Sequence, residues 1–228
     1  MAAPPDWMTT TWQTLPRFFR LLAKIRPTFH FPDVTALNRA FLDKYGAAAL
    51  LWDVDGTLMP HHDTRVASEF RDALRSLENE VPQAILSNCG EERLAELGTI
   101  FPELPVLKAY RTDAGATVLR CLERGQERWT VRTAMTHEPI ERPAGRLTPL
   151  KKPSADLIEC ALHRLGAADR RDHVFMVGDQ YFTDIAGANL AGIRSIKVPT
   201  FGRRSFPFAI RCFQLIERAI YRLLHGKI

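Results

Sequence analysis

Apolar runs of strand length alternate with stretches of amphipathic helical spacing, and this alternation constrains the fold more than any other feature of the chain. The apolar runs occupy residues 47–53, 82–87, 105–110, 173–177 and 193–198, and the main helical stretches are 67–78, 91–100, 154–165 and 183–191. Strands that alternate with helices are typical of βαβ units, which build a parallel sheet covered by helices on both faces. The sequence therefore predicts a Rossmann-like three-layer α/β/α fold with a parallel sheet.

The segment 111–150 does not follow this alternation. It holds a helix-like piece at 116–123, residues of strand type at 129–131, and then a proline-containing stretch. We expect it to be an insertion of about 40 residues that forms a lid or flap, within a core domain that spans residues 45–200.

Length and composition are those of one globular domain with a sizeable core, because the chain has 228 residues, of which 46% are hydrophobic and 25% charged. The four cysteines form no CxxC pair of the kind that a zinc or redox site uses, so we expect free thiols in a reducing, cytoplasmic compartment. No apolar run approaches the roughly 18 residues that would span a bilayer. We therefore expect no transmembrane segment.

The net charge of +5 is concentrated at the two ends of the chain. Residues 201–228 carry six basic residues against one acidic residue, and residues 1–30 carry four against one, which leaves 31–200 with a net charge of −3. Two basic ends on a mildly acidic body argue against a nucleic-acid-binding domain. We expect a basic amphipathic lead-in over 1–44 and a basic amphipathic C-terminal helix within 201–228.

Both ends show apolar residues at helical spacing beside basic ones. In the C-terminal segment one predicted face is apolar, and Arg211, Arg218 and Arg222 fall on the other; near the N-terminus Trp7 and Trp12 precede a similar pattern. Basic amphipathic helices with aromatic residues lie flat on anionic membranes, which predicts peripheral association with the inner face of a membrane. Packing on the core or on another subunit is the alternative interpretation, and for the acid-poor N-terminus an organelle transit peptide is another.

Polar residues follow three of the predicted strands. The first strand runs into Asp53 and Asp55, the second into Ser87-Asn88, and the fourth into Gly178-Asp179. In open parallel sheets, ligands bind outside the carboxyl ends of the strands. These side chains are therefore expected to meet at one edge of the sheet.

Acids at these strand ends predict a metal site. Asp53 and Asp55 repel each other unless a cation or proton lies between them, and Gly56 allows the chain to turn so that both reach one point. With Asp179 and Asp184 they form a cluster of oxygen ligands, which suits Mg²⁺.

A phosphate group also needs donors. Ser87 offers a hydroxyl, Asn88 offers a backbone N–H at a strand-to-helix junction, and Lys152 offers a fixed positive charge. With Mg²⁺ on one side and lysine on the other, the charge of a phosphoryl group is neutralised and a carboxylate can attack it.

Simpler interpretations exist for several of these residues. Asp184 could cap the following helix, Ser87-Asn88 could cap another, and Lys151 rather than Lys152 could supply the cation. His61 and His62 follow the first motif closely, but histidines in a loop are more often solvated than catalytic.

In four motifs the chain resembles the haloacid dehalogenase (HAD) superfamily of phosphatases. They are Asp-Val-Asp-Gly-Thr-Leu at 53–58, Leu-Ser-Asn at 86–88, Lys-Lys-Pro at 151–153 and Val-Gly-Asp-Gln-Tyr-Phe-Thr-Asp at 177–184. They occur in the family's order, and the resemblance covers roughly residues 45–200.

The resemblance implies a role for each matching residue. Asp53 would be the nucleophile that forms a covalent aspartyl-phosphate, and Asp55 the general acid and base. Ser87 would bind the phosphate, and Lys152 would orient both the nucleophile and the phosphate. Asp179 would bind Mg²⁺.

The chain also resembles the capless branch (subfamily IIIA) of this superfamily, which includes phosphatidylglycerophosphate phosphatases. The similarity lies in Gly-Asp-Gln followed by Thr-Asp, where Asp184 would support the metal or the lysine, and in the basic tail. The chain departs from that branch at Gly56, where asparagine is common, and in the insertion 111–150.

Three functions remain open at this point. The first is a peripheral membrane phosphatase for a lipid phosphomonoester such as phosphatidylglycerophosphate. The second is a soluble phosphatase for a small metabolite, over which the 111–150 segment closes as a lid. The third is a catalytically silent phosphate-binding scaffold, against which the intact Asp53 and Asp55 argue.

Overall fold

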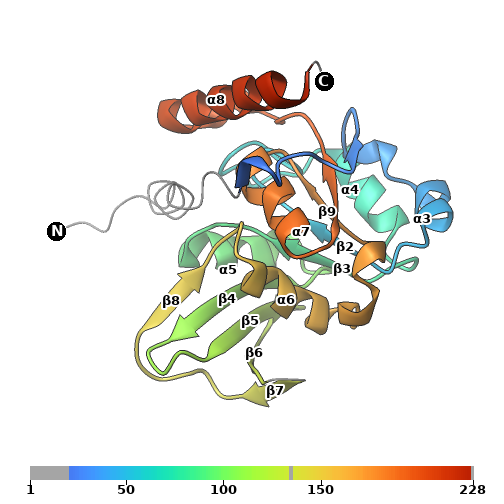
Figure 1. Cartoon of the computed structure of the whole chain (residues 1–228). Coiled ribbons are helices and arrows are strands. Elements are labelled where there is room, and N and C mark those ends of the chain that lie inside the picture. The colour runs from blue at the N-terminus through green and yellow to red at the C-terminus, as the bar shows by residue number, and fades with distance from the viewer. Residues whose placement is uncertain (1–20, 134–135, 227–228) are drawn as a thin grey trace.

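A computed structural model describes residues 21–133 and 136–226 (Figure 1). The apolar and basic residues predicted to form an N-terminal helix before Leu21 lie outside this range, as does Lys227.

One sheet runs through the molecule, in the strand order β1-β10-β9-β2-β3-β4-β5-β6-β7, with β8 paired to β4. All neighbours from β1 to β4 in this order are parallel. These parallel strands are β1 (Phe29–His30), β2 (Ala49–Trp52), β3 (Gln83–Leu86), β4 (Val106–Thr112), β9 (Val174–Gly178) and β10 (Arg194–Lys197). The five predicted strands are therefore all present, and β1 is an additional short one.

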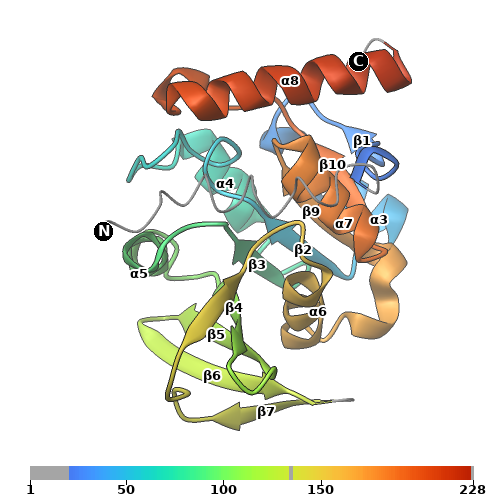
Figure 2. The same cartoon turned by 60° about the vertical axis from the view of Figure 1, so that its left-hand side comes forward.

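Helices cover both faces of the parallel strands (Figures 1 and 2). They are α3 (Arg39–Tyr45), α4 (Ser68–Ser76), α5 (Glu91–Ile100), α6 (Ala155–Arg164), α7 (Ala186–Leu190) and α8 (Phe208–His225). Single turns occur at η2 (Val34–Ala36), η3 (Ala168–His173) and η5 (Arg203–Ser205), and a π-helical turn, η4, spans Tyr181–Ile185.

The strand residues alternate between two hydrophobic cores, because successive side chains in a strand point to opposite faces. Leu50 and Trp52 of β2 belong to the core that includes residues of α3, α4 and α5. Ala49 and Leu51 of the same strand belong to the core that includes residues of α6 and α7. The predicted three-layer α/β/α fold with a mostly parallel sheet is confirmed.

The segment after β4 differs from its prediction. Residues 116–123, expected to be helix-like, form β5 (Thr117–Glu123), which pairs antiparallel with β4 and with β6 (Gln126–Arg132). Leu119 packs against the α6 side of the sheet, whereas Val118 packs on the opposite side with Trp129. The apolar spacing of this piece also fits a strand, and pairing on both edges decided between the two.

Where a lid or flap was expected, the chain continues the sheet. After β6 come β7 (His137–Ile140) and β8 (Leu147–Leu150), and β8 returns to pair antiparallel with β4. Ion pairs from Arg111 and Arg132 to Asp156 connect this antiparallel part to α6. The chain then leaves β8 directly for Lys151-Lys152.

The C-terminal helix α8 lies across the edge of the molecule farthest from β6 and β7 (Figures 1 and 2). Its buried residues are Gln214, Glu217 and Tyr221. Among the described residues, no helix combines the length and apolar character that crossing a membrane requires.

Candidate active site

Three buried carboxylates meet at the carboxyl ends of neighbouring strands. Asp53 follows β2, Asp179 follows β9, and Asp184 lies in the π-helical turn η4. One carboxylate oxygen from each lies within 4.8 Å of the other two. The Asp53 N–H donates to the carbonyl of Val177 at 2.9 Å, which aligns the ends of β2 and β9. Adjacent parallel strands thus bring together acids that are over a hundred residues apart in the sequence.

A buried lysine connects two of these acids. The Nζ of Lys152 lies 2.5 Å from Oδ1 of Asp53 and 2.7 Å from Oδ1 of Asp184, and its side chain is 1% exposed. Burial alone would lower the pKa of Lys152, but the carboxylates of Asp184 and Asp53 outweigh it and raise that pKa. Lys152, rather than Lys151, is therefore the cation at the acid cluster, and it stays charged.

The position of Lys152 is set by Asn88. The Asn88 Oδ1 accepts a hydrogen bond from the Lys152 N–H at 2.7 Å, and the Asn88 Nδ2 donates to the Lys152 carbonyl at 3.0 Å. Ser87 is buried next to Asn88, at the end of β3, the strand beside β2 in the sheet. The motif expected to bind phosphate therefore also holds the lysine through the Asn88 side chain, a contact that sequence reasoning did not predict.

The electrostatics of the cluster fit a divalent cation. Burial raises the pKa of Asp53 well above its ordinary value, against the effect of Lys152. Burial, and then the nearby Asp184 carboxylate, raise the pKa of Asp179 to about 6. Neither oxygen of Asp179 accepts a hydrogen bond of good geometry from the described residues, although the Thr200 side chain is close enough to oppose the rise. Three carboxylates against Lys152 and the buried Lys197, whose charge also acts on Asp179, still leave an excess of negative charge, and oxygen ligands of this kind suit Mg²⁺.

Two glycines permit this close approach. A Cβ at Gly178 would lie 2.4 Å from the side chain of Asp184, so only glycine fits there with Asp184 in its present position. Gly56 has φ +92°, and a Cβ there would lie 2.8 Å from the Phe206 ring and 3.0 Å from Oδ2 of Asp179. The ring of Phe206 thus gives a steric reason for glycine at position 56, where the resembled branch commonly has asparagine.

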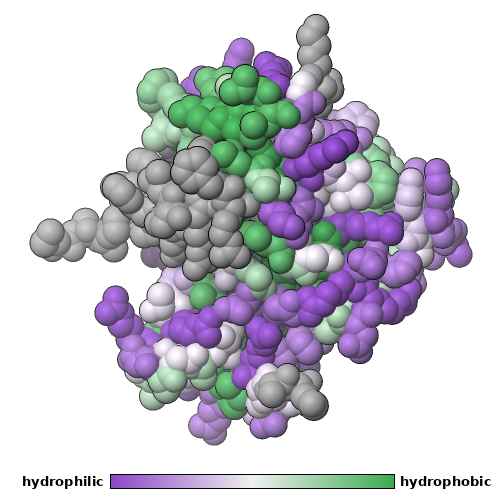
Figure 3. Space-filling view, in the orientation of Figure 1, coloured by the Kyte–Doolittle hydropathy of each residue, from purple (hydrophilic) through white to green (hydrophobic). Residues whose placement is uncertain are grey.

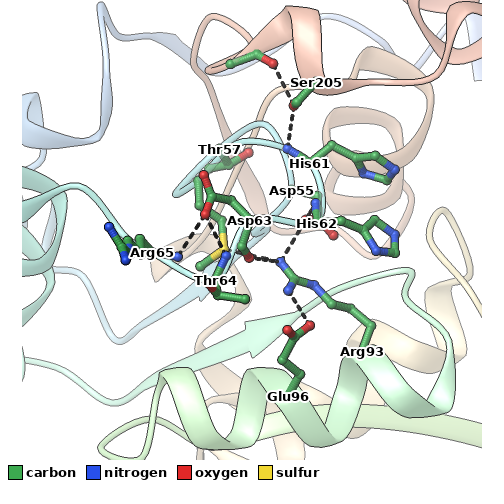
Figure 4. A network of polar contacts seen from close by, with 12 residues as sticks. Asp55, Thr57, His61, His62, Asp63, Thr64, Arg65, Arg93, Glu96 and Ser205 are labelled. Atoms are coloured by element: carbon green, nitrogen blue, oxygen red, sulfur yellow. Dashed lines mark hydrogen bonds and ion pairs between the residues drawn. The ribbon is translucent and has the colours of Figure 1, made fainter.

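The carboxylate of Asp55 is not one of the three clustered acids. Figure 4 shows it beside the side chain of Arg93. Its Oδ1 accepts hydrogen bonds from the His62 N–H at 3.0 Å and from Nη2 of Arg93 at 3.1 Å. Arg93 is 4% exposed, and it also donates to the carbonyl of Asp63 and to Glu96. Asp55 was predicted as a metal ligand together with the other acids; its side chain contacts Arg93, and its role as a ligand stays a prediction.

Arg93 is the main residue that sequence reasoning missed. It lies in α5, and its i,i+3 spacing to Glu96 indicates an ordinary exposed helical ion pair. Only the packing of α5 against the loop after β2 places its guanidinium on Asp55. The two histidines stay near this loop: the His61 ring stacks on Phe206 with centroids 4.7 Å apart, and His62 contributes its backbone N–H.

One comparison with known proteins, a family model, supports a hydrolase. A HAD-hydrolase-like family model matches residues 149–204, which contain Lys152, Asp179 and Asp184, and this match supports the HAD superfamily. Among solved structures, the chain is similar to an uncharacterized protein from Listeria monocytogenes serotype 4b, with 19% identity and a TM-score of 0.41 over 66% of this chain and 77% of that one. No curated protein matches the chain.

Proposed function

We propose that this protein is a Mg²⁺-dependent phosphomonoester hydrolase that forms a covalent aspartyl-phosphate on Asp53. The observation that carries the proposal is the pair of contacts from the buried Lys152 to Asp53 and Asp184, next to Asp179, whose two oxygens accept no hydrogen bond of good geometry from the described part of the chain. A nucleophilic carboxylate, a fixed cation and a site for a divalent ion are the elements that phosphoryl transfer to aspartate needs.

Asp53, Asp179 and Asp184 would hold the divalent ion, which when bound would supply positive charge to the phosphoryl oxygens. Lys152 holds Oδ1 of Asp53, and Thr57 donates to Oδ2 of Asp53 at 3.1 Å, so the nucleophile is oriented from both sides. Attack by the Asp53 carboxylate on phosphorus breaks the ester P–O bond, and Asp55 gives a proton to the leaving oxygen. Asp55 then takes a proton from the water that attacks the aspartyl-phosphate, which releases inorganic phosphate and restores Asp53.

Arg93 is proposed to position Asp55 for its role as general acid and base. It engages Oδ1 of Asp55, which fixes the carboxylate and leaves its second oxygen for proton transfer. Ser87, at the end of β3, is proposed as a phosphate ligand, together with the backbone N–H of Asn88.

For the substrate we propose a lipid phosphomonoester such as phosphatidylglycerophosphate, acted on from a membrane surface. The resemblance to the capless branch supports this choice. So does the continuation of residues 111–150 as sheet, because a small-metabolite phosphatase of the alternative kind was expected to close a lid from that segment.

The reaction is tested by phosphate release from p-nitrophenyl phosphate with and without Mg²⁺. Asp53→Asn should abolish turnover and retain the fold, whereas Asp55→Asn should lower the rate by about 10²–10⁴ and still allow attack by Asp53. The exposed Asp43→Asn is the control for a lost aspartate charge and should keep full activity. Release at the wild-type rate by Asp53→Asn would disprove the covalent mechanism.

The intermediate and the substrate are tested separately. With ³²P-labelled substrate and acid quench, wild type and Asp55→Asn should retain protein-bound label that hydroxylamine removes, and Asp53→Asn should not. Release rates from phosphatidylglycerophosphate in mixed micelles are then compared with those from a panel of soluble phosphorylated metabolites. A metabolite turned over faster than the lipid would reject the lipid assignment and leave the phosphatase assignment intact.

A further inference from the structure

Helix α8 turns a band of large apolar side chains away from the protein. Leu223 is 85% and Phe208 is 77% exposed. The other large hydrophobic residues exposed on α8 are Leu215, Ile216 and Leu224. Figure 3 shows hydrophobic surface over α8 at the top of the molecule. Large contiguous apolar surfaces of this kind mark sites of interaction.

The outward orientation follows from what the inner side of α8 contacts. Glu217 accepts a hydrogen bond from the N–H of Phe182 at 2.8 Å, and Arg218 donates to the Thr200 hydroxyl at 3.1 Å. Tyr221 stacks on Tyr181 of η4 with ring centroids 4.4 Å apart. With 3.6 residues per turn, a helix that points 214, 217 and 221 at the core points 208, 212, 219 and 223 away from it.

The outer face of α8 is apolar and positively charged, with no acidic group. The helix has one acidic residue, Glu217, and its side chain is 1% exposed on the inner side. Arg211 and Arg222 are exposed beside the apolar band, and Arg204 is exposed just before the helix. All charge that the outer face offers to a partner is therefore positive.

We propose that this outer face of α8 docks on an anionic lipid bilayer. A bilayer accepts the apolar side chains at the acyl boundary and supplies negative charge to the arginines beside them. A second copy of this face would bring arginines against arginines with no acid to pair them. Residues 1–20 contain one acidic and two basic residues, so they offer little complementary charge either.

The loop before α8 contacts the loop after β2: the Phe201 N–H donates to the Gly56 carbonyl at 2.7 Å, and the Ser205 hydroxyl accepts from the His61 N–H at 2.8 Å. Docking through α8 would therefore place the bilayer on an element that is joined directly to the loop carrying Asp55. This deepens the proposed lipid-phosphatase function, but binding can be measured without turnover.

The experiment is co-sedimentation of the full chain with phosphatidylcholine vesicles, with and without phosphatidylglycerol. Wild type should bind only the anionic vesicles, and binding should weaken as salt rises. Arg211→Glu/Arg222→Glu should weaken it by roughly 100-fold or more, because each reversal removes one attraction and adds one repulsion. Phe208→Gln/Leu223→Gln should weaken it by at least roughly 10-fold through lost burial.

The control is Arg128→Glu/Arg142→Glu, which makes the same charge change at exposed positions of the antiparallel part. It should bind like wild type, and all variants should hydrolyse p-nitrophenyl phosphate at the wild-type rate. No binding by wild type, or equal losses in the control and the α8 variants, would overturn the proposal. If wild type is a dimer and Phe208→Gln/Leu223→Gln dissociates it, the face binds a second copy. That result would also overturn the proposal.

If wild type does not bind vesicles and Phe208→Gln/Leu223→Gln has a lower melting temperature than wild type, the face is covered by residues 1–20. This outcome would overturn the proposal. Vesicle binding that persists in an Asp53→Asn protein lacking turnover would support docking independently of the proposed reaction. Binding without any phosphatase activity in the wild type would reject the function and keep the docking surface.

Discussion

The π-helical turn η4 takes part in two buried carboxylate sites, and the negative charge of the carboxylates is balanced differently in the two. On the catalytic side Asp184 is 2.7 Å from Lys152, next to Asp53 and Asp179. On the α8 side Glu217 accepts a hydrogen bond from the Phe182 N–H, and burial raises its pKa to about 8. One site pairs two of its acids with a buried lysine, which opposes the rise in the pKa of Asp53, while the other holds an acid whose pKa burial raises with no ion-pair partner among the described residues.

The two carboxyl sites differ because one is proposed to react with substrate and the other only holds two elements together. A nucleophilic carboxylate must be ionised, so the catalytic side carries a buried cation in spite of the desolvation that this costs. Glu217 only has to orient α8 on η4, and a neutral carboxyl group can do that through its hydrogen bond to Phe182.

Lys152→Met should have the largest effect. Without the lysine, three carboxylates face one another, so turnover of p-nitrophenyl phosphate should fall by at least about 10³. In Mg²⁺-free buffer the free energy of unfolding should fall by roughly 3–5 kcal/mol, because buried charges lose their partner. Urea titrations with and without Mg²⁺ measure this. The exposed Lys44→Met is the matched control, and equal losses in the two variants would contradict the assigned role.

Glu217→Gln should change how stability depends on pH. The folded-state pKa of Glu217 is raised, so its contribution is fully present below the unfolded pKa near 4.5 and is lost as pH rises through about 8. The amide keeps the acceptor for the Phe182 N–H but cannot ionise. At pH 9 the variant should therefore be more stable than wild type by about 2–4 kcal/mol, and at pH 5 nearly equal. Urea unfolding at both pH values measures it; a difference that does not grow with pH would show that Glu217 is already ionised in the fold.

Gly178→Ala should disturb the catalytic side only. Its Cβ would lie 2.4 Å from Asp184, so the carboxylate must move away from Lys152. We expect a loss of about 1–3 kcal/mol in unfolding free energy and a marked fall in kcat. Gly98→Ala in α5 is the control, since its Cβ would come no closer than 3.3 Å to Leu122. Wild-type kcat in Gly178→Ala would show that the Asp184 position does not matter for turnover.

Gln214→Leu should give the smallest effect, in the stabilising direction. Gln214 is 2% exposed on the inner face of α8, and neither its Nε2 nor its Oε1 has a hydrogen-bond partner among the described residues. Replacing an unpaired buried amide with an apolar side chain of similar size should raise the unfolding free energy by about 1 kcal/mol. Thermal denaturation checks the sign. A destabilised variant would indicate that the amide is hydrogen-bonded, for example through a buried water.

The sequence was most informative where pattern and geometry coincide. The strand-length apolar runs at 47–53 and 173–177, alternating with helical stretches, predicted strands of a parallel sheet, and ligands bind at the carboxyl ends of such strands. Asp53 and Asp179 were therefore predicted at one place before any coordinates, and they lie there. By contrast, 116–123 has apolar spacing that fits helix and strand alike, and only pairing with β4 and β6 made it β5.

Local pattern also determined the amphipathic character of 208–224, but not which face points inward. That was decided by η4, whose Phe182 N–H needs an acceptor and whose Tyr181 ring needs a partner, so Glu217 and Tyr221 turn to the core and the apolar band turns out. In the same way, hydrogen bonds join Arg93 to Asp55 and Asn88 to Lys152, residues that are far apart in the sequence. Periodicity reports burial along one element, whereas such contacts depend on how separate elements pack, and only the tertiary structure decides that.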